Sequence, residues 1–245
     1  MTPARQDIRF ALFSTLDLES PAALRPVIDD LLRAPVGLKP IQYGRDEPNL
    51  PIRDASDVVS AATVGVSTSG LRNGGISLKA GSAVSYNIRW SKLADPTFSL
   101  VFGSLQRDPA ESLQARLAAW CDLVRELVRT CDAVYGEIRD MSAPFANMPF
   151  DLKTRLPDIQ PVSIYGAPYV RLFGEKLATA PFHRIERLPT GHYWLEAGDS
   201  ILTPISEDAK SDIRRHLGED AFMSGGKRLY RTGLAPEFDF HALLP

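Results

Sequence analysis

One long amphipathic helix is the strongest structural signal in the sequence. Asp108 can cap this helix, and Pro109 suits its first turn, where no backbone donor is required. Helical spacing then places a set of apolar residues on one continuous face. The members of this face are Leu113, Leu117, Trp120, Cys121, Val124, Leu127, Val128 and Cys131. Residues 109–131 therefore predict a helix that supplies a major part of a hydrophobic core.

Alternating apolar and polar residues predict antiparallel strands around this helix. The clearest alternation runs through residues 84–90, as a half-buried strand requires. Asn73-Gly74-Gly75 predicts a hairpin turn within a meander from 64 to 103, because asparagine and glycine tolerate positive φ. Residues 8–13 predict a buried first strand, and 132–138 predict a strand after the helix.

A second helical pattern opens at Ser20, and a proline-punctuated stretch follows it. Pro26 would remove a hydrogen bond inside the helix, so regular helix is predicted to begin just before it. Residues 36–57 predict a long loop, with one short helix near 54–60. A loop of this length either connects two elements through solvent or takes part in function.

The stretch from 163 to 204 combines a helix, a glycine stop and a hairpin. Residues 167–178 predict the helix, with Pro168 at an early position where no backbone donor is needed. Strand-like runs at 182–188 and 192–197 flank a turn at Thr190-Gly191, and 206–217 predicts a further helix. The pattern reads Tyr-Gly-x-x-Tyr-Val-x-x-Phe-Gly-x-x-Lys-Leu from Tyr165 to Leu177, followed by Ala180-Pro181 and the hairpin.

This pattern resembles one found in immunity proteins of bacterial toxin systems, including those paired with type VI secretion effectors. The middle of the chain resembles them as well, with short strands, a long helix and then Val134-Tyr135-Gly136. The resemblance covers roughly positions 60–222 and is carried by packing and turn residues. Members of these families bind and neutralise a cognate toxin, usually without enzymatic activity. The resemblance therefore implies a non-enzymatic protein with a toxin or secreted effector as its partner.

The expected fold is α+β, with mainly antiparallel sheets packed against amphipathic helices. Prolines punctuate residues 142–161, which predicts a crossover there. We expect an N-terminal subdomain at 1–141 and a C-terminal subdomain at 162–245, arranged sequentially in one globular unit.

Composition and charge exclude several classes of partner. The formal net charge is −2 and the isoelectric point is about 6.1, which gives no basic footprint for nucleic acid. No apolar run approaches the roughly 20 residues needed to span a bilayer. The first residues lack a secretory pattern of basic residues followed by a long apolar stretch. The expected location is therefore the cytoplasm.

Local motifs indicate no catalytic set, cofactor or metal. Cys121 and Cys131 would lie roughly 15 Å apart along one helix, too far for a disulfide, which needs a Cα separation of about 4.4–6.8 Å. His183 and His192 offer a metal-site alternative if they face each other across the hairpin beside Glu186 or Glu196. Exposed polar strand residues are the other interpretation of this group.

The leading hypothesis is an immunity protein that sterically covers one toxin. Acidic side chains near aromatic residues are the candidate contacts for a basic partner. These candidates are Tyr43, Asp46, Glu47, Glu237 and Asp239. The alternative hypothesis is an enzyme or small-ligand-binding protein with a pocket between the two subdomains. A structural or adaptor subunit is a third interpretation, and the sequence leaves a homodimer open.

Overall fold

The chain combines antiparallel strands with helices and divides into two units. Its fold class is therefore α+β, as the sequence predicts. The computed structural model describes residues 7–62, 66–68, 71–92, 99–106, 113–141, 152 and 156–222. The units comprise Met1–Ala133 and Val134–Pro245, and each combines antiparallel strands with helices. The sequence places a crossover at 142–161, whereas the units divide just before Val134. The strand that begins there pairs with a strand of the second unit, which ties residues 134–140 to that unit.

The first unit is built on an antiparallel sheet with the strand order β1–β7–β6–β5–β2–β3. A further strand, β4, pairs with β5. The strands are β1 (Asp7–Ser14), β2 (Gln42–Gly44), β3 (Leu50–Pro51), β4 (Val66–Thr68), β5 (Leu71–Ala80), β6 (Val84–Lys92) and β7 (Ser99–Gln106). In β1, every second residue is buried, so one face of the strand belongs to the core.

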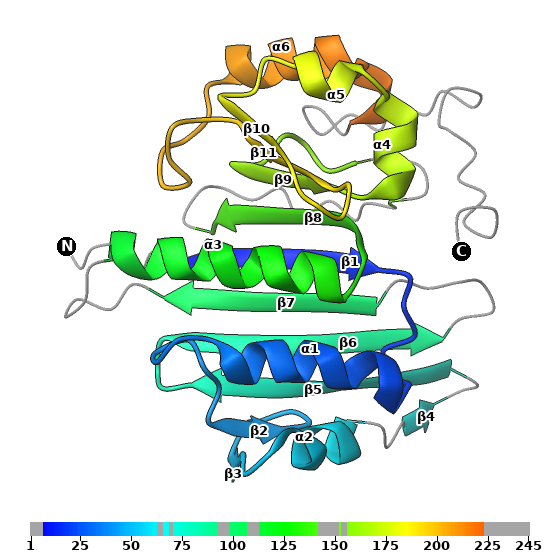
Figure 1. Cartoon of the computed structure of the whole chain (residues 1–245), viewed down its shortest axis with the longest axis vertical. Coiled ribbons are helices and arrows are strands. Elements are labelled where there is room, and N and C mark those ends of the chain that lie inside the picture. The colour runs from blue at the N-terminus through cyan, green and yellow to red at the C-terminus, as the bar shows by residue number, and fades with distance from the viewer. Residues whose placement is uncertain are drawn as a thin grey trace. The chain divides into compact units, whose positions relative to one another are not determined.

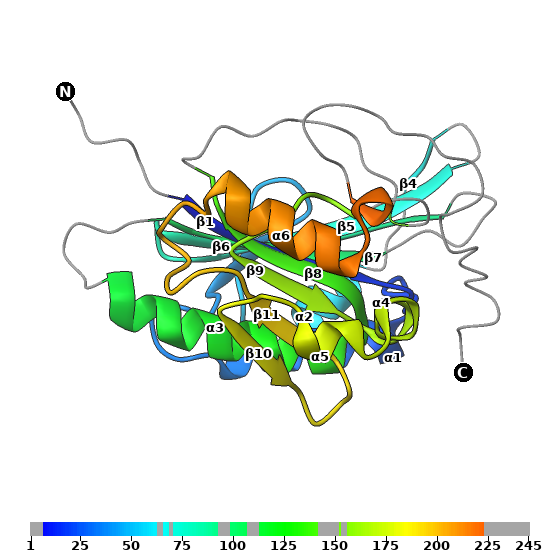
Figure 2. The same ribbon diagram turned by 90° about the horizontal axis from the view of Figure 1, so that it is seen from above.

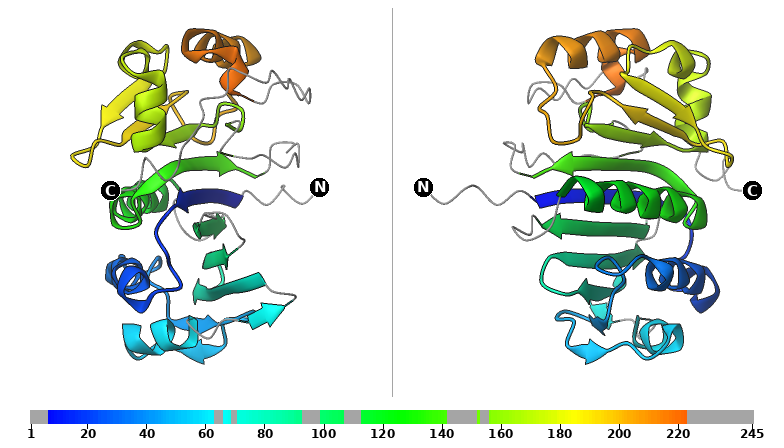
Figure 3. Two further views of the ribbon diagram at one scale, coloured as in Figure 1. Left: turned by 90° about the vertical axis from the view of Figure 1, so that its right-hand side faces the viewer. Right: turned by 60° about the vertical axis from the view of Figure 1, so that its left-hand side comes forward.

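Three helices cover one face of this sheet, as Figures 1 and 3 show. They are α1 (Pro21–Arg33), α2 (Ala55–Ala62) and α3 (Leu113–Thr130). The core between sheet and helices centres on Trp120, whose ring lies 5.2 Å from that of Phe10 and 5.6 Å from that of Tyr86. Gly103 on β7 makes room for these rings, because a Cβ there would lie 2.5 Å from Phe10 and 2.9 Å from Trp120.

The strands of the second unit pair antiparallel in the order β8–β9–β11–β10. Its strands are β8 (Ala133–Asp140), β9 (Val162–Tyr165), β10 (Arg184–Arg187) and β11 (Tyr193–Glu196). Its helices are α4 (Ala167–Phe173), α5 (Lys176–Thr179), α6 (Glu207–Leu217) and the 3-10 helix η1 (Glu219–Ala221). Helix α6 packs beside α5 (Figure 2). Ser206 caps α6 by accepting a hydrogen bond from the Ala209 amide.

Aromatic rings form much of the core of the second unit. Tyr135 and Tyr165 lie opposite each other on β8 and β9, with ring centroids 6.1 Å apart. Tyr169 and Phe173 from α4 lie 5.7 Å and 5.5 Å from the Tyr165 ring. Phe222, just after η1, stacks on Phe173. The helical face that the sequence predicts for Tyr169 and Phe173 therefore packs in this core.

Several predicted elements are confirmed. The hairpin at Thr190-Gly191 joins β10 to β11, and Gly191 has the positive φ that the turn requires. Cys121 and Cys131, both on or next to α3, are not joined by a disulfide bond, and Cys131 is buried. The predicted helix at 109–131 is present as α3, and its proposed capping residues at 108 and 109 lie outside the described residues.

One predicted turn and one predicted helix start are wrong. The segment Asn73–Gly75 lies inside β5, and the β5–β6 turn falls at Gly81 instead. Gly74 is needed for close packing, because a Cβ there would overlap the Trp90 ring. Helix α1 begins at Pro21 and contains Pro26. Pro26 is exposed, so water can satisfy the carbonyl that it leaves without a partner.

Two further boundaries differ from the prediction. The stretch 36–57 contains β2 and β3 and the first residues of α2, so it is less irregular than a loop. The predicted helix at 167–178 is divided into α4 and α5, because Gly174 adopts a φ of 55° that ends the first helix.

Candidate functional site

The first three sequence-predicted contact residues lie in one hairpin at the edge of the first sheet. Tyr43 is in β2, and Asp46 and Glu47 follow it in the turn toward β3. Strand β2 pairs with β5 on one side and with β3 on the other, and β3 is the terminal strand of this sheet order. We call the segment 41–52 the edge hairpin. The edge hairpin lies at the lower end of Figure 1, beside α2.

Backbone contacts fix the turn of the edge hairpin. The chain turns so closely that a Cβ on Gly44 would overlap the Glu47 carbonyl. The Arg45 carbonyl accepts hydrogen bonds from Ser77 Oγ and Arg89 Nη1, each at 3.4 Å. Ser77 and Arg89 come from β5 and β6, so both strands hold the turn in place. The turn is therefore preorganised by the sheet.

The turn presents an acidic pair, Asp46 and Glu47, to solvent. Both residues are exposed. Within the described part of the chain, neither carboxylate makes a hydrogen bond or an ion pair. Burial lowers the pKa of Arg89, and the charge of Asp46 acts in the opposite direction. Asp46 is thus close enough to Arg89 to interact with it, yet remains available to a partner.

An apolar strip runs along the same hairpin. Tyr43 lies opposite Leu50 and also opposite Leu78 of β5, so these side chains share one face of the sheet. Ile41 is two residues before Tyr43 and takes the same face. The side chains of Ile41 and Leu50 are 57% and 50% exposed, and Tyr43 is half-buried. We call Ile41, Tyr43 and Leu50 the apolar strip.

Sequence reasoning missed Ile41 and Leu50. The prolines at 40, 48 and 51 indicated a loop, whereas the spacing Ile41-x-Tyr43 and Leu50-x-Ile52 around a turn is typical of a short hairpin. That alternation was the signal available in the sequence. The two remaining predicted contacts, Glu237 and Asp239, lie outside the described residues.

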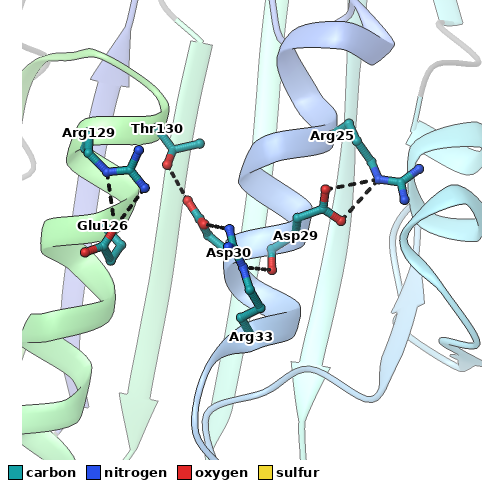
Figure 4. Close-up of polar contacts among 7 residues, drawn as sticks. All are labelled: Arg25, Asp29, Asp30, Arg33, Glu126, Arg129 and Thr130. Atoms are coloured by element: carbon teal, nitrogen blue, oxygen red, sulfur yellow. Dashed lines mark hydrogen bonds and ion pairs between the residues drawn. The ribbon is translucent and has the colours of Figure 1, made fainter.

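Charged side chains on the outer surfaces of α1 and α3 form ion pairs within each helix, as Figure 4 shows. Arg25 lies 3.1 Å from Asp29 on α1, and Arg129 lies 2.8 Å from Glu126 on α3. Asp30, which is only 6% exposed, accepts hydrogen bonds from Arg33 and from the Thr130 hydroxyl. The Asp30–Thr130 contact joins α1 to the end of α3. The charged side chains of this surface are therefore engaged in direct contacts within the fold.

We expect Asp30→Ala to lower the free energy of unfolding by about 2 kcal/mol, because the buried acceptor of Thr130 is lost. The matched control is Asp29→Ala, which removes the exposed pair with Arg25 and should cost about 0.5 kcal/mol or less. Urea unfolding followed by circular dichroism measures both values. Equal losses for the two variants would contradict the structural role of Asp30.

A buried carboxylate distinguishes the second unit. Glu137 on β8 is 2% exposed. Its Oε2 accepts a hydrogen bond from the Tyr135 hydroxyl at 3.0 Å, and its Oε1 lies 3.2 Å from Arg139 Nη1. Burial raises the pKa of Glu137, whereas Arg139 and the Tyr135 hydrogen bond partly oppose this rise. Because it is buried, this group contributes to the packing of the second unit and is not a surface contact.

The two histidines of the metal-site alternative do not face each other. Arg184 pairs with Glu196 and Arg187 pairs with Tyr193, so His183 and His192 fall at opposite ends of the hairpin. His192 is buried, and its Nδ1 lies 2.8 Å from Thr190 Oγ1. Across the described residues, no group of three or more histidine, cysteine, aspartate or glutamate side chains is placed to hold a metal ion.

The described helices include none with the length and apolar character needed to cross a bilayer.

Comparison with known proteins identifies a similar fold. No protein-family model matches the chain, and no curated protein matches it. Among solved structures, it is similar to the Pseudomonas aeruginosa T6SS protein PA0821, with a TM-score of 0.61 and 12% sequence identity. The match covers 89% of this chain and 73% of that chain. At this identity the likeness establishes the fold.

Proposed function

We propose that this chain is an immunity protein of a type VI secretion system that binds one cognate effector and neutralises it sterically. The observation that carries the proposal is the structural likeness to a T6SS protein over 89% of this chain. The pattern from Tyr165 to Leu177 supports it independently, since it resembles a segment of immunity proteins. The chain would act in the cytoplasm, where an incoming effector meets its target.

The proposed mechanism requires a binding surface but no catalytic activity. A stable complex buries about 1,200–2,000 Å2 in total, although area alone does not set affinity. The immunity protein would cover the active site or the substrate surface of the effector in a one-to-one complex. Its own contribution is a rigid, preformed surface, which limits the entropy lost on binding.

The test is binding and protection by the purified pair. We expect the full chain to form a one-to-one complex with the effector encoded beside its gene, as measured by light scattering after size exclusion. We also expect its co-expression to restore growth of cells that produce the active effector. An effector from an unrelated secretion locus is the control and should neither bind nor be neutralised. An active cognate effector that neither binds nor is neutralised would overturn the proposal.

A further inference from the structure

We infer that the edge hairpin is the docking surface for the effector, and that the effector meets it with an apolar side chain surrounded by lysine or arginine. This inference rests on the proposed function and adds the contact surface and the chemistry of the partner. The acidic pair lies in the turn of the edge hairpin, and the apolar strip lies on the segments that flank this turn. Two of the three strip residues are at least half exposed.

The apolar strip is unusual for this protein. Across the residues that the structure describes, the exposed large apolar side chains are Val36, Ile41 and Leu50. Two of the three therefore belong to the edge hairpin. Their face of the sheet is the one that carries Leu78, which is fully buried in the core. The strip thus continues the core-facing side of the sheet, but Ile41 and Leu50 remain exposed there, and an apolar partner side chain would cover them.

The hairpin is also rigid enough to act as a binding surface. The Ile41 amide donates to the Lys79 carbonyl at 2.9 Å, and the Ile52 amide donates to the Ile41 carbonyl at 3.0 Å. The Arg45 carbonyl is held by Ser77 and Arg89. A surface that is already ordered loses little conformational entropy when it binds, so more of the contact energy appears as affinity.

Charge complementarity selects a basic partner. Asp46 and Glu47 are exposed and, within the described chain, are not engaged in ion pairs. The acidic residues in Figure 4 are in direct ion pairs within the protein, whereas Asp46 acts on Arg89 through its charge without such a contact. Lysine or arginine on the effector would gain the attraction of the acidic pair, which favours fast and specific association.

Other ways of using this edge fit less well. Pro51 in β3 has no amide hydrogen to donate, which disfavours the addition of a partner strand. A second copy of the chain, docked about a two-fold axis at this hairpin, would bring two acidic pairs together. Recognition through side chains by a basic, apolar-tipped partner satisfies both features of the surface.

The experiment compares hairpin variants in calorimetric titrations with the catalytically inactive effector encoded beside the gene for this chain. We expect Leu50→Asp to weaken binding by about 100-fold, because it places a charge at the apolar contact. The double variant Asp46→Lys with Glu47→Lys should weaken binding by at least about tenfold and reduce its sensitivity to salt.

Matched controls lie on the exposed surface of α3. Ala118→Asp adds the same charge as Leu50→Asp, and Asp122→Lys with Glu126→Lys makes the same charge reversal as the double variant. The controls should bind with wild-type affinity. Circular dichroism and thermal unfolding of all variants establish that each is folded. A folded hairpin variant that loses affinity while its control does not would support the inference.

The contrary outcomes separate this inference from the proposed function. Wild-type binding that all hairpin variants retain would overturn the docking surface and leave the immunity function standing. Wild-type protein that does not bind the effector would overturn both. Self-association of the wild type that Leu50→Asp abolishes, with unchanged effector affinity, would assign the hairpin to a second copy and overturn the inference.

Discussion

Replacing Trp120 with alanine is expected to lower the free energy of unfolding by about 4 kcal/mol, the usual loss for a large buried aromatic residue. Trp120 is fully buried, and its ring contacts those of Phe10 and Tyr86. Gly103 lies directly beneath these rings. The alanine variant would leave a cavity at the point where α3, β1, β6 and β7 converge, and the rigid sheet could fill little of it.

Trp120→Phe is the matched control. It retains an aromatic ring at the same position and should lose less than half as much stability. Guanidinium unfolding, monitored by far-ultraviolet circular dichroism, measures both variants. A loss below about 1 kcal/mol for Trp120→Ala would show that this contact is not the centre of the first core.

The importance of Trp120 could be predicted from sequence because helical periodicity determines which side of α3 is apolar. The turn predicted at Asn73–Gly75 from the tolerance of asparagine and glycine for positive φ is wrong, because tertiary packing overrides this local preference. Gly74 lies against the Trp90 ring and accommodates it by having no side chain. A contact between partner strands, absent from any local pattern, therefore decided the conformation of this segment.

The candidate site was only partly predictable for a related reason. Tyr43, Asp46 and Glu47 are predicted as contacts because acidic side chains lie near an aromatic one in the sequence, and the structure places them in one hairpin. The exposure of Ile41 and Leu50 depends on their position at the end of the strand order. These are properties of strand order, and periodicity within a single strand does not contain them.

Glu137 shows the same limit in the second unit. Its two hydrogen-bonding or ionic partners, Tyr135 and Arg139, lie two residues away on the same strand, so the local cluster could be read from the alternation of β8. The burial of Glu137 could not be predicted from this alternation, because it arises from β9 and from the aromatic residues packed on that side. Burial rather than sequence proximity gives this carboxylate its energetic importance.

Replacing Glu137 with alanine is expected to lower the free energy of unfolding by about 3 kcal/mol at neutral pH. The variant removes the acceptor that Tyr135 and Arg139 share while leaving a buried polar environment. Glu137→Gln is the control, since it keeps an acceptor for the tyrosine hydroxyl and removes the charge. Urea unfolding should show a smaller loss for glutamine than for alanine. Equal losses would indicate that the ion pair, and not the hydrogen bond, carries the stabilisation.

The pH dependence of this pair gives a second readout of the same group. Burial raises the pKa of Glu137 in the folded protein above its ordinary value of 4.5. At pH values between the pKa of Glu137 in the unfolded chain and its raised pKa in the folded protein, the folded state binds more protons than the unfolded chain. The free energy of unfolding therefore falls as pH rises through this range. The wild type should therefore lose stability relative to Glu137→Gln as pH rises above about 4.5. Unfolding curves for the two proteins from acid to neutral pH measure this difference, and a constant difference would show that Glu137 has no raised pKa.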